Sequence, residues 1–245
     1  KQAGLPDGVF NVVQGDKEMV DGILEHPGIA GVSFVGSTAV GEYVYQKGTS
    51  HNKRVAAFTG GKNHMVVMPD ADLDAAASAF VAAGFGSASQ RCMAVSLLLP
   101  VGQATADRLR ELVIEKTKAL KVGPYNDPQA DFGAVVSAQS KQAVLQAIEN
   151  CIKDGGELLL DGRGLQVPGH ANGYYVGPTL FDRVTTDMQM YKEEIFGPVR
   201  AIMRPMTLDE AIAITNAHDF GNGSVIYTRD GKSAHRFMTE VESGM

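Results

Sequence analysis

Short apolar runs that suit buried strands alternate with segments of helical periodicity along almost the whole sequence. Such alternation with short turns predicts an α/β fold, in which an open, mostly parallel sheet carries helices on both faces. The expected strands lie at 9–13, 31–35, 54–58, 65–68, 95–99 and 157–160, and the expected helices at 17–25, 37–46, 72–85, 104–120 and 140–154. Segments 198–203, 208–217, 224–227 and 233–240 continue the series.

Glycine-containing segments interrupt this series at two places. Gly60 and Gly61 stand where one βα series ends and another begins, so we expect a domain boundary there. The segment 162–177 is rich in glycine and proline, which predicts a long surface connection.

The bulk composition narrows the class of protein. The chain has 245 residues, 44% of them hydrophobic, which is enough for one large domain or two small ones. Its net charge is −6 and its basic residues are scattered, which argues against nucleic-acid or anionic-membrane partners. No apolar run reaches membrane-spanning length. Two cysteines without paired spacing favour a reducing compartment, so we expect a cytoplasmic protein, or a mitochondrial one in a eukaryote.

The segment 34–41 places a glycine turn and two hydroxyl residues between a strand and a helix. Free N–H groups and the helix dipole at Ser37, after the turn at Gly36, favour an anion such as a pyrophosphate. A phosphate-hydrolysing loop is excluded, because Glu42 and Tyr43 replace the required Lys and Ser/Thr. An ordinary helix cap by Ser37 remains open.

Two other segments match a known binding motif only in part, and both binding roles are rejected. The glycine-containing segment 84–89 follows a helix where a dinucleotide fingerprint needs a strand. The acidic segment 70–74 lacks the glycine and the glutamate of a calcium loop. The six histidines show no metal-ligand spacing, so we expect no metal.

Cys92 lies in the turn between a long helical pattern and a strand. Arg91 beside it would stabilise the thiolate, which is the nucleophilic form of cysteine. From spacing alone, a buried inert cysteine is the better interpretation. A Cys–His hydrolase that uses His64 is also open on spacing, although nothing further supports it.

An ordered set of five segments changes the interpretation of Cys92. Together they resemble the aldehyde dehydrogenase superfamily over essentially the whole chain. The segments are Leu5-Pro6-Asp7-Gly8-Val9-Phe10-Asn11-Val12-Val13, residues 34–41, Gly60-Gly61-Lys62-Asn63, Gln90-Arg91-Cys92 and Glu193-Glu194-Ile195-Phe196-Gly197-Pro198-Val199.

This resemblance implies roles for particular residues. Cys92 matches the nucleophile that attacks the aldehyde carbonyl, and Gly36 and Ser37 match the contact to the NAD pyrophosphate. Glu194 matches the acid that holds the nicotinamide ribose, and Phe196 the aromatic residue beside it. Taken alone, Glu194 would read as a solvated acid and Phe196 as a core aromatic residue.

Several positions resemble the CoA-acylating, methylmalonate-semialdehyde branch of the superfamily. Hydrolytic members carry a glutamate where this chain has Phe58, which cannot accept a proton. Segments 62–71 and 90–94 are similar to the CoA-dependent branch, in which Arg91 matches the arginine that receives the substrate carboxylate. Ser89, Phe58 and Gly61 depart even from that branch's commonest residues.

The resemblance therefore implies oxidation of a malonate-type semialdehyde by NAD through a Cys92 thioester, with loss of CO2 and acyl transfer to coenzyme A. It implies that residues 1–61 are the tail of a cofactor domain and residues 62–245 most of a catalytic domain, in a chain that begins within a longer, homo-oligomeric protein. The alternatives are a hydrolytic aldehyde dehydrogenase and an inactive structural member of the superfamily.

Overall fold

The computed structural model describes residues 2–245, which form two compact units, residues 2–60 and Gly61–Met245. No helix in the described part is long and apolar enough to cross a membrane. The α/β fold with a mostly parallel sheet is confirmed. Assignment of the two units to a cofactor domain and a catalytic domain remains a prediction.

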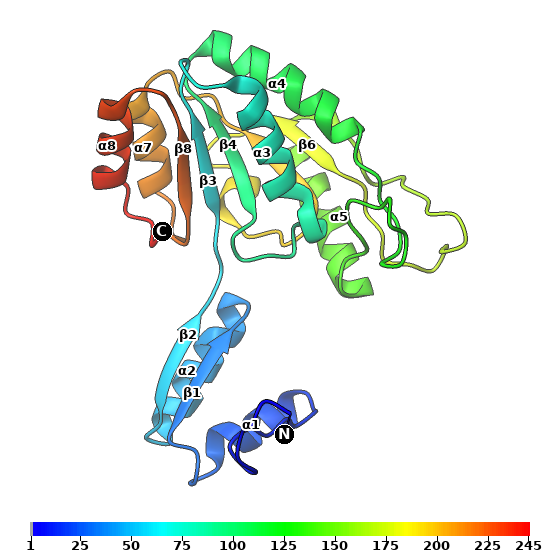
Figure 1. Cartoon of the computed structure of the whole chain (residues 1–245), viewed down its shortest axis with the longest axis vertical. Helices are drawn as coiled ribbons and strands as arrows, with labels where there is room; N and C mark the ends of the chain where they lie inside the picture. The colour runs from blue at the N-terminus through cyan, green and yellow to red at the C-terminus, as the bar shows by residue number, and fades with distance from the viewer. Residues whose placement is uncertain (1) are drawn as a thin grey trace. The chain divides into compact units, whose positions relative to one another are not determined.

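The first unit is a two-stranded parallel sheet with two helices (Figure 1). Strands β1 (Gly31–Val35) and β2 (Arg54–Phe58) pair in register, and helix α2 (Thr38–Ser50) connects them, after α1 (Lys17–Glu25). Both strands alternate exposed and half-buried residues, so one face of the sheet is packed and the other is open.

The second unit is a six-stranded sheet in the order β5-β6-β7-β4-β3-β8. All neighbours are parallel except β5 and β6. Its strands are β3 (Asn63–Val67), β4 (Val95–Pro100), β5 (Glu157–Leu160), β6 (Thr179–Asp182), β7 (Val199–Ile202) and β8 (Ser224–Tyr227). Its helices are α3 (Leu73–Phe85), the 3-10 turn η1 (Gly86–Ser89), α4 (Gln103–Lys118), α5 (Ala138–Lys153), α6 (Gln189–Lys192), α7 (Leu208–Asn216) and α8 (Gly231–Glu240).

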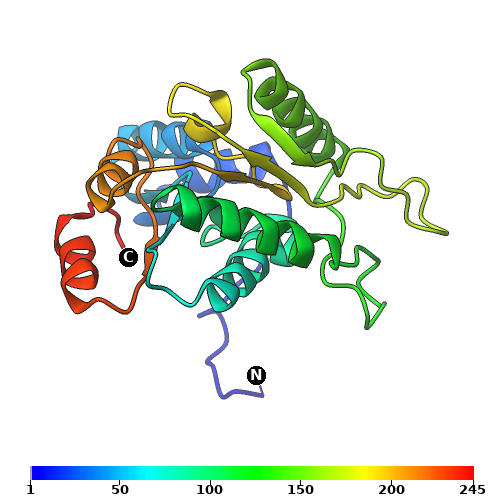
Figure 2. The same ribbon diagram turned by 90° about the horizontal axis from the view of Figure 1, so that it is seen from above.

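Helices cover both faces of the six-stranded sheet (Figure 2). Period-two alternation along the central strands fills a hydrophobic core on each face. Met65, Val67 and Leu98 pack under α3 and α4, whereas Val66 and Leu97 pack under α5, α7 and α8 on the opposite face. Because both faces are covered, β3 is buried along its whole length.

Helix starts follow local capping chemistry. Asp72 accepts the backbone N–H of Ala75 at 3.1 Å at the start of α3. Ser137, Thr207 and Asp230 cap α5, α7 and α8 through their side chains in the same way.

Two sequence predictions of secondary structure are corrected. Residues 9–13 do not form a strand: Val9 is 65% exposed and Phe10 73% exposed. Because a strand needs a neighbour to pair with and the sheet of this unit contains only β1 and β2, the apolar pattern at 9–13 has no ladder to join. Strand β6 and helix α6 were not expected, and each is only four residues long.

A buried carboxylate at the end of β6 ties three segments together. Asp182 is fully buried and accepts two hydrogen bonds from Arg204, at 2.9 and 2.6 Å. Arg110 of α4 lies 3.2 Å from the same carboxylate. Arg204 also pairs with Asp107, which is 57% exposed, at 2.7 Å.

This cluster provides a matched pair of variants. Asp182→Asn should lower the free energy of unfolding by about 3–5 kcal/mol, because it removes the buried anion that Arg204 and Arg110 share. Asp107→Asn removes an exposed partner of the same Arg204 and should cost about 0–1 kcal/mol. Urea denaturation measures both, and equal losses would show that burial does not govern the strength of this cluster.

Candidate functional site

Four loops of the second unit meet at one edge of its sheet. Strands β7, β4, β3 and β8 are parallel neighbours, so the loops that enter them lie at the same edge. These loops carry Glu194 before β7, Cys92 before β4, Lys62 before β3 and Asn222 before β8. The fold thus gathers the predicted nucleophile and the predicted ribose-binding acid at one edge of the sheet, although they are far apart in sequence.

The segment that presents Cys92, residues 84–94, is called the nucleophile turn here. Ser87, Ala88 and Ser89 adopt positive φ angles of 60°, 51° and 62°. The buried hydroxyl of Ser89 donates to the carbonyl of Gly84, which closes the turn back onto the end of α3.

Two asparagine side chains hold the backbone of Cys92. Asn63 Nδ2 and Asn222 Nδ2 donate to the Cys92 carbonyl at 2.8 and 2.7 Å. Asn63 also donates to the Ala94 carbonyl at 2.8 Å and accepts the N–H of Gly223 at 2.9 Å, which uses both ends of its amide. The main chain from the Cys92 carbonyl to the Ala94 carbonyl is therefore held by β3 and by the loop before β8.

Arg91 lies on the opposite side of the turn. Its Nη2 donates to the carbonyls of Ala82 and Ala83 at 3.1 and 3.2 Å, at the carboxyl end of α3. A Cβ on Gly86 would come within 2.6 Å of this nitrogen, so only glycine leaves room for the contact. The guanidinium thus stabilises the helix end, and its predicted contact with a substrate carboxylate remains a prediction.

The two thiols differ in environment. Cys92 is exposed, whereas Cys151 on α5 is fully buried. Burial, with a smaller effect of Asp154, raises the pKa of Cys151 to about 12. Of these two thiols, only Cys92 is accessible to a reagent or a substrate, which a reactive cysteine requires.

Residues 193–197 form a second turn, called the acidic turn here. Burial raises the pKa of the half-buried Glu194 carboxyl, and the N–H of Gly61, which bonds to it, acts in the opposite direction. Phe196 has a positive φ of 51° and a side chain that is 44% exposed. Glu194 is therefore a partly desolvated acceptor beside an exposed ring.

Lys62 anchors the start of the acidic turn. Its side chain is 3% exposed, and its Nζ donates to the Glu193 carbonyl at 2.6 Å. Burial, and then the nearby Arg200, lower its pKa to about 7. No sequence pattern assigned a role to this amine, because the lysine is followed by the polar Asn63 and His64 and resembles a loop residue.

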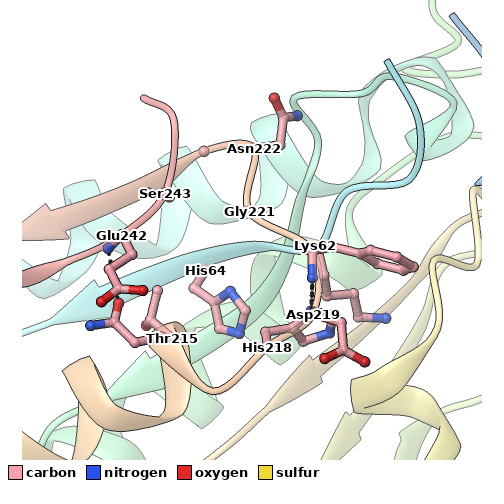
Figure 3. Close-up of a pocket in the computed structure, with 12 residues that line it drawn as sticks. Lys62, His64, Thr215, His218, Asp219, Gly221, Asn222, Glu242 and Ser243 are labelled. Carbon is pink, nitrogen blue, oxygen red and sulfur yellow. Dashed lines mark hydrogen bonds between the residues drawn. The ribbon is translucent and has the colours of Figure 1, made fainter. Parts of the chain in front are cut away.

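A cavity of about 180 Å³ adjoins these loops (Figure 3). Lys62 lines it from the loop before β3, His64 lines it from β3, and Glu242 and Ser243 line it from the end of the chain (Figure 3). His64 Nε2 is buried without a hydrogen bond among residues 2–245. Burial, and then His218, lower the pKa of His64 to about 3, so this ring is neutral and poorly suited to act as a base for Cys92.

The remaining predicted site residues belong to the first unit. Gly36 and Ser37 follow the carboxyl end of β1, and Ser37 occupies the N-cap of α2 without a side-chain capping bond. Its hydroxyl and the first N–H groups of this helix are therefore available to an anion. Phe58 ends β2, and its ring is 63% exposed.

These observations agree with what NAD requires. The free N-terminus of α2 suits a pyrophosphate, and the Glu194 carboxylate is an acceptor suited to ribose hydroxyls. Among residues 2–245, no group of three or more His, Cys, Asp or Glu side chains could hold a metal ion.

Comparisons with known proteins identify the family to which this chain is similar. The aldehyde dehydrogenase family matches residues 1–245. A malonate-semialdehyde dehydrogenase of Pseudomonas aeruginosa is 50% identical over 244 residues, which cover 100% of this chain and 49% of that protein. An acylating mitochondrial methylmalonate-semialdehyde dehydrogenase of Arabidopsis thaliana is 45% identical, covering 99% of this chain and 40% of that protein.

The solved structures give the same result. A protein of Sinorhizobium meliloti assigned as a methylmalonate-semialdehyde dehydrogenase, and crystallised with NAD, is similar with a TM-score of 0.97 and 48% identity. The match covers 100% of this chain and 50% of that one. The chain thus spans about half the length of the relatives it matches.

The contrast between the two cysteines predicts selective labelling. Iodoacetamide should modify Cys92 first, because the raised pKa of Cys151 alone leaves roughly a thousandfold less thiolate than a free thiol has. Peptide mapping by mass spectrometry gives both rates on one sample. Faster modification of Cys151 would be incompatible with Cys92 as the nucleophile.

Lys62 predicts a pH dependence of stability. The folded-state pKa of about 7 lies below the reference value of 10.5, so between these values the unfolded chain binds a proton that the folded chain has released. Above pH 10.5, titration of this amine therefore costs the folded state no stability. As the pH falls towards 7, the free energy of unfolding decreases, because the unfolded chain takes up the proton first.

Lys62→Met supplies the measurement. The free energy of unfolding of the wild type minus that of Lys62→Met should increase with pH across this window, by at most about 1.4 kcal/mol per pH unit. Urea denaturation from pH 7 upward gives the slope, which does not depend on the fixed cost of losing the bond to Glu193. A flat difference would mean that the amine keeps its proton in the folded chain.

Proposed function

The chain belongs to the aldehyde dehydrogenase family, and from that premise we propose that it supplies the nucleophile of an NAD-dependent enzyme that oxidises a malonate-type semialdehyde and transfers the acyl group to coenzyme A. The observation that carries the proposal is the exposed Cys92, held by Asn63 and Asn222 at the sheet edge that also carries Glu194. The names of the similar malonate- and methylmalonate-semialdehyde dehydrogenases support the substrate class.

In the proposed reaction, the Cys92 sulfur adds to the aldehyde carbonyl carbon and forms a thiohemiacetal. The hydrogen bonds to the Cys92 and Ala94 carbonyls hold the backbone that carries the sulfur, which supports a defined direction of attack. NAD, when bound, supplies the two-electron oxidant that converts this adduct into a thioester. A malonyl-type thioester can then lose CO2, because its carbonyl accepts the developing electron pair.

Four residues are proposed to contact NAD, and each is described within its own unit. Gly36 and Ser37 would present the start of α2 to the pyrophosphate, and Glu194 would accept hydrogen bonds from ribose hydroxyls. The ring of Phe196, exposed beside Glu194, would pack against the cofactor.

Arg91 is proposed to receive the substrate carboxylate. Only its Nη2 is engaged with α3 carbonyls in the described part of the chain, which leaves other guanidinium N–H groups for a bidentate partner. A carboxylate there would distinguish a semialdehyde acid from a simple aldehyde.

Release of the acyl group separates the proposal from its hydrolytic alternative. Hydrolysis needs a base to deprotonate water, and Phe58 stands at the position matching the glutamate of hydrolytic relatives. General-base assistance typically contributes about 10²–10⁴-fold, so water should attack slowly. A thiol depends less on a general base, because a thiol with a pKa of about 8.5 is partly ionised at neutral pH. Coenzyme A is therefore the better acceptor.

The test uses a family-length protein that carries this sequence, with malonate semialdehyde as substrate. Without CoA, it should give one burst of NADH equivalent to its active sites, and mass spectrometry should find the acyl group on Cys92. Addition of CoA should then start sustained turnover. Rapid turnover to free acid without CoA would refute acyl transfer and favour the hydrolytic alternative.

Phe58→Glu is the matched gain-of-function variant. If the missing base limits hydrolysis, the variant should release free acid faster after the burst, by up to about 10²-fold. Cys92→Ser serves as the control without a thiol and should give no burst. A wild-type protein that binds NAD but gives no burst would identify the inactive structural alternative.

A further inference from the structure

Arg200 is a buried cation in the middle of an apolar strand. It lies on β7, its side chain is 3% exposed, and the residues on both sides of it are apolar. Among residues 2–245, no carboxylate contributes to its pKa, which burial and then the like charge of Arg91 lower to about 9. A buried guanidinium without an anion is unfavourable, so this position calls for a physical reason.

The side chain reaches two separate loops of the site. Its Nε donates to the Gly84 carbonyl at 2.7 Å, and its Nη2 donates to the Gly197 carbonyl at 3.0 Å. Gly84 begins the nucleophile turn, and Gly197 ends the acidic turn. A Cβ on Gly84 would lie 3.2 Å from Arg200 Cδ, so the guanidinium stem packs closely against this glycine.

Neither carbonyl depends on Arg200 for a hydrogen bond. The hydroxyl of Ser89 also donates to the Gly84 carbonyl, and the N–H of Val199 donates to the Gly197 carbonyl at 2.7 Å. Without Arg200, both acceptors would still have a partner. What the arginine alone adds is a direct connection between the two turns.

We propose that Arg200 is a positioning residue that couples the nucleophile turn to the acidic turn, so that Cys92 and Glu194 keep a fixed relative geometry. This inference rests on the proposed function, because it matters for catalysis only if Cys92 reacts while Glu194 holds NAD. The planar guanidinium suits the role, because its N–H groups point in fixed and different directions.

Two other side chains each hold one turn alone, and they serve as matched controls. Ser89 closes the nucleophile turn onto Gly84, and Lys62 anchors the start of the acidic turn through the Glu193 carbonyl. Ser89→Ala should therefore disturb only the first turn, and Lys62→Met only the second. Arg200→Met should disturb both.

The first measurement is hydrogen–deuterium exchange in a family-length protein that carries this sequence. Arg200→Met should speed amide exchange by about tenfold or more in peptides from both turns, which is the effect expected from losing hydrogen bonds to a charged donor. Ser89→Ala should speed it in the nucleophile turn, and Lys62→Met in the acidic turn. This readout needs neither NAD nor turnover, so it tests the coupling even if the proposed function fails.

The second measurement is kinetic. Arg200→Met should both raise the Michaelis constant for NAD and slow acylation of Cys92 at saturating NAD, each by about tenfold. Lys62→Met should change mainly the former, and Ser89→Ala mainly the latter. If Arg200→Met alters only one turn in exchange and only one of these constants, the coupling is refuted.

Arg200→Lys keeps the proposal testable if the methionine variant does not fold. Lysine retains the charge but has a single nitrogen on a shorter stem, so it should keep one of the two hydrogen bonds and protect one turn. Wild-type exchange at both turns in Arg200→Lys would show that the charge alone is sufficient, and would overturn the bridging role.

Discussion

Parallel pairing of β7, β4, β3 and β8 is the constraint on which the candidate site depends, because it brings four loops to one edge of the sheet. The register is fixed by burial on both faces: a slip of one residue would exchange Val66 with Met65 and Val67 between two different cores. These loops enter at the amino ends of the strands, whereas open α/β sheets usually bind ligands at the carboxyl ends. The first unit follows that usual rule, since Ser37 comes after the carboxyl end of β1.

Two buried cations, Lys62 and Arg200, stand where the packing of an apolar sheet would favour hydrocarbon. Lys62 donates to the Glu193 carbonyl, and Arg200 donates to the carbonyls of Gly84 and Gly197. Burial lowers the pKa of both; Arg200 lowers that of Lys62 further, and Arg91 lowers that of Arg200 further. Hydrophobic replacements of buried charges are often neutral or stabilising, so stability alone does not account for these residues. Positions that break the local rules of folding concentrate at functional sites, and both cations contact turns that carry proposed site residues.

Local patterns were sufficient to predict most strands and helices, because short apolar runs mark buried strands such as β3 and capping residues such as Asp72 mark helix starts. It failed at 9–13, where an apolar pattern has no neighbouring strand, and at β6, where four residues follow a Gly- and Pro-rich connection. The hydrogen bonds from Asn63 and Asn222 to the Cys92 carbonyl were not predictable from spacing, because Asn222 lies 130 residues further along the chain than Cys92. Arg200 did carry a signal, a charge within an apolar run, but its two acceptors depend on the tertiary fold.

The nucleophile turn shows how the chain meets a local conformational cost. Three consecutive residues without the freedom of glycine, Ser87, Ala88 and Ser89, lie in the left-handed region, at about 1–2 kcal/mol each. The Ser89 bond to Gly84 and the bonds of Asn63 and Asn222 to Cys92 hold this conformation from two sides. The conformational free energy of this turn is therefore spent once, during folding, and does not recur at each turnover. For the proposed reaction, this means that the Cys92 backbone needs no reorganisation when the aldehyde arrives, so binding energy remains available for the chemical step.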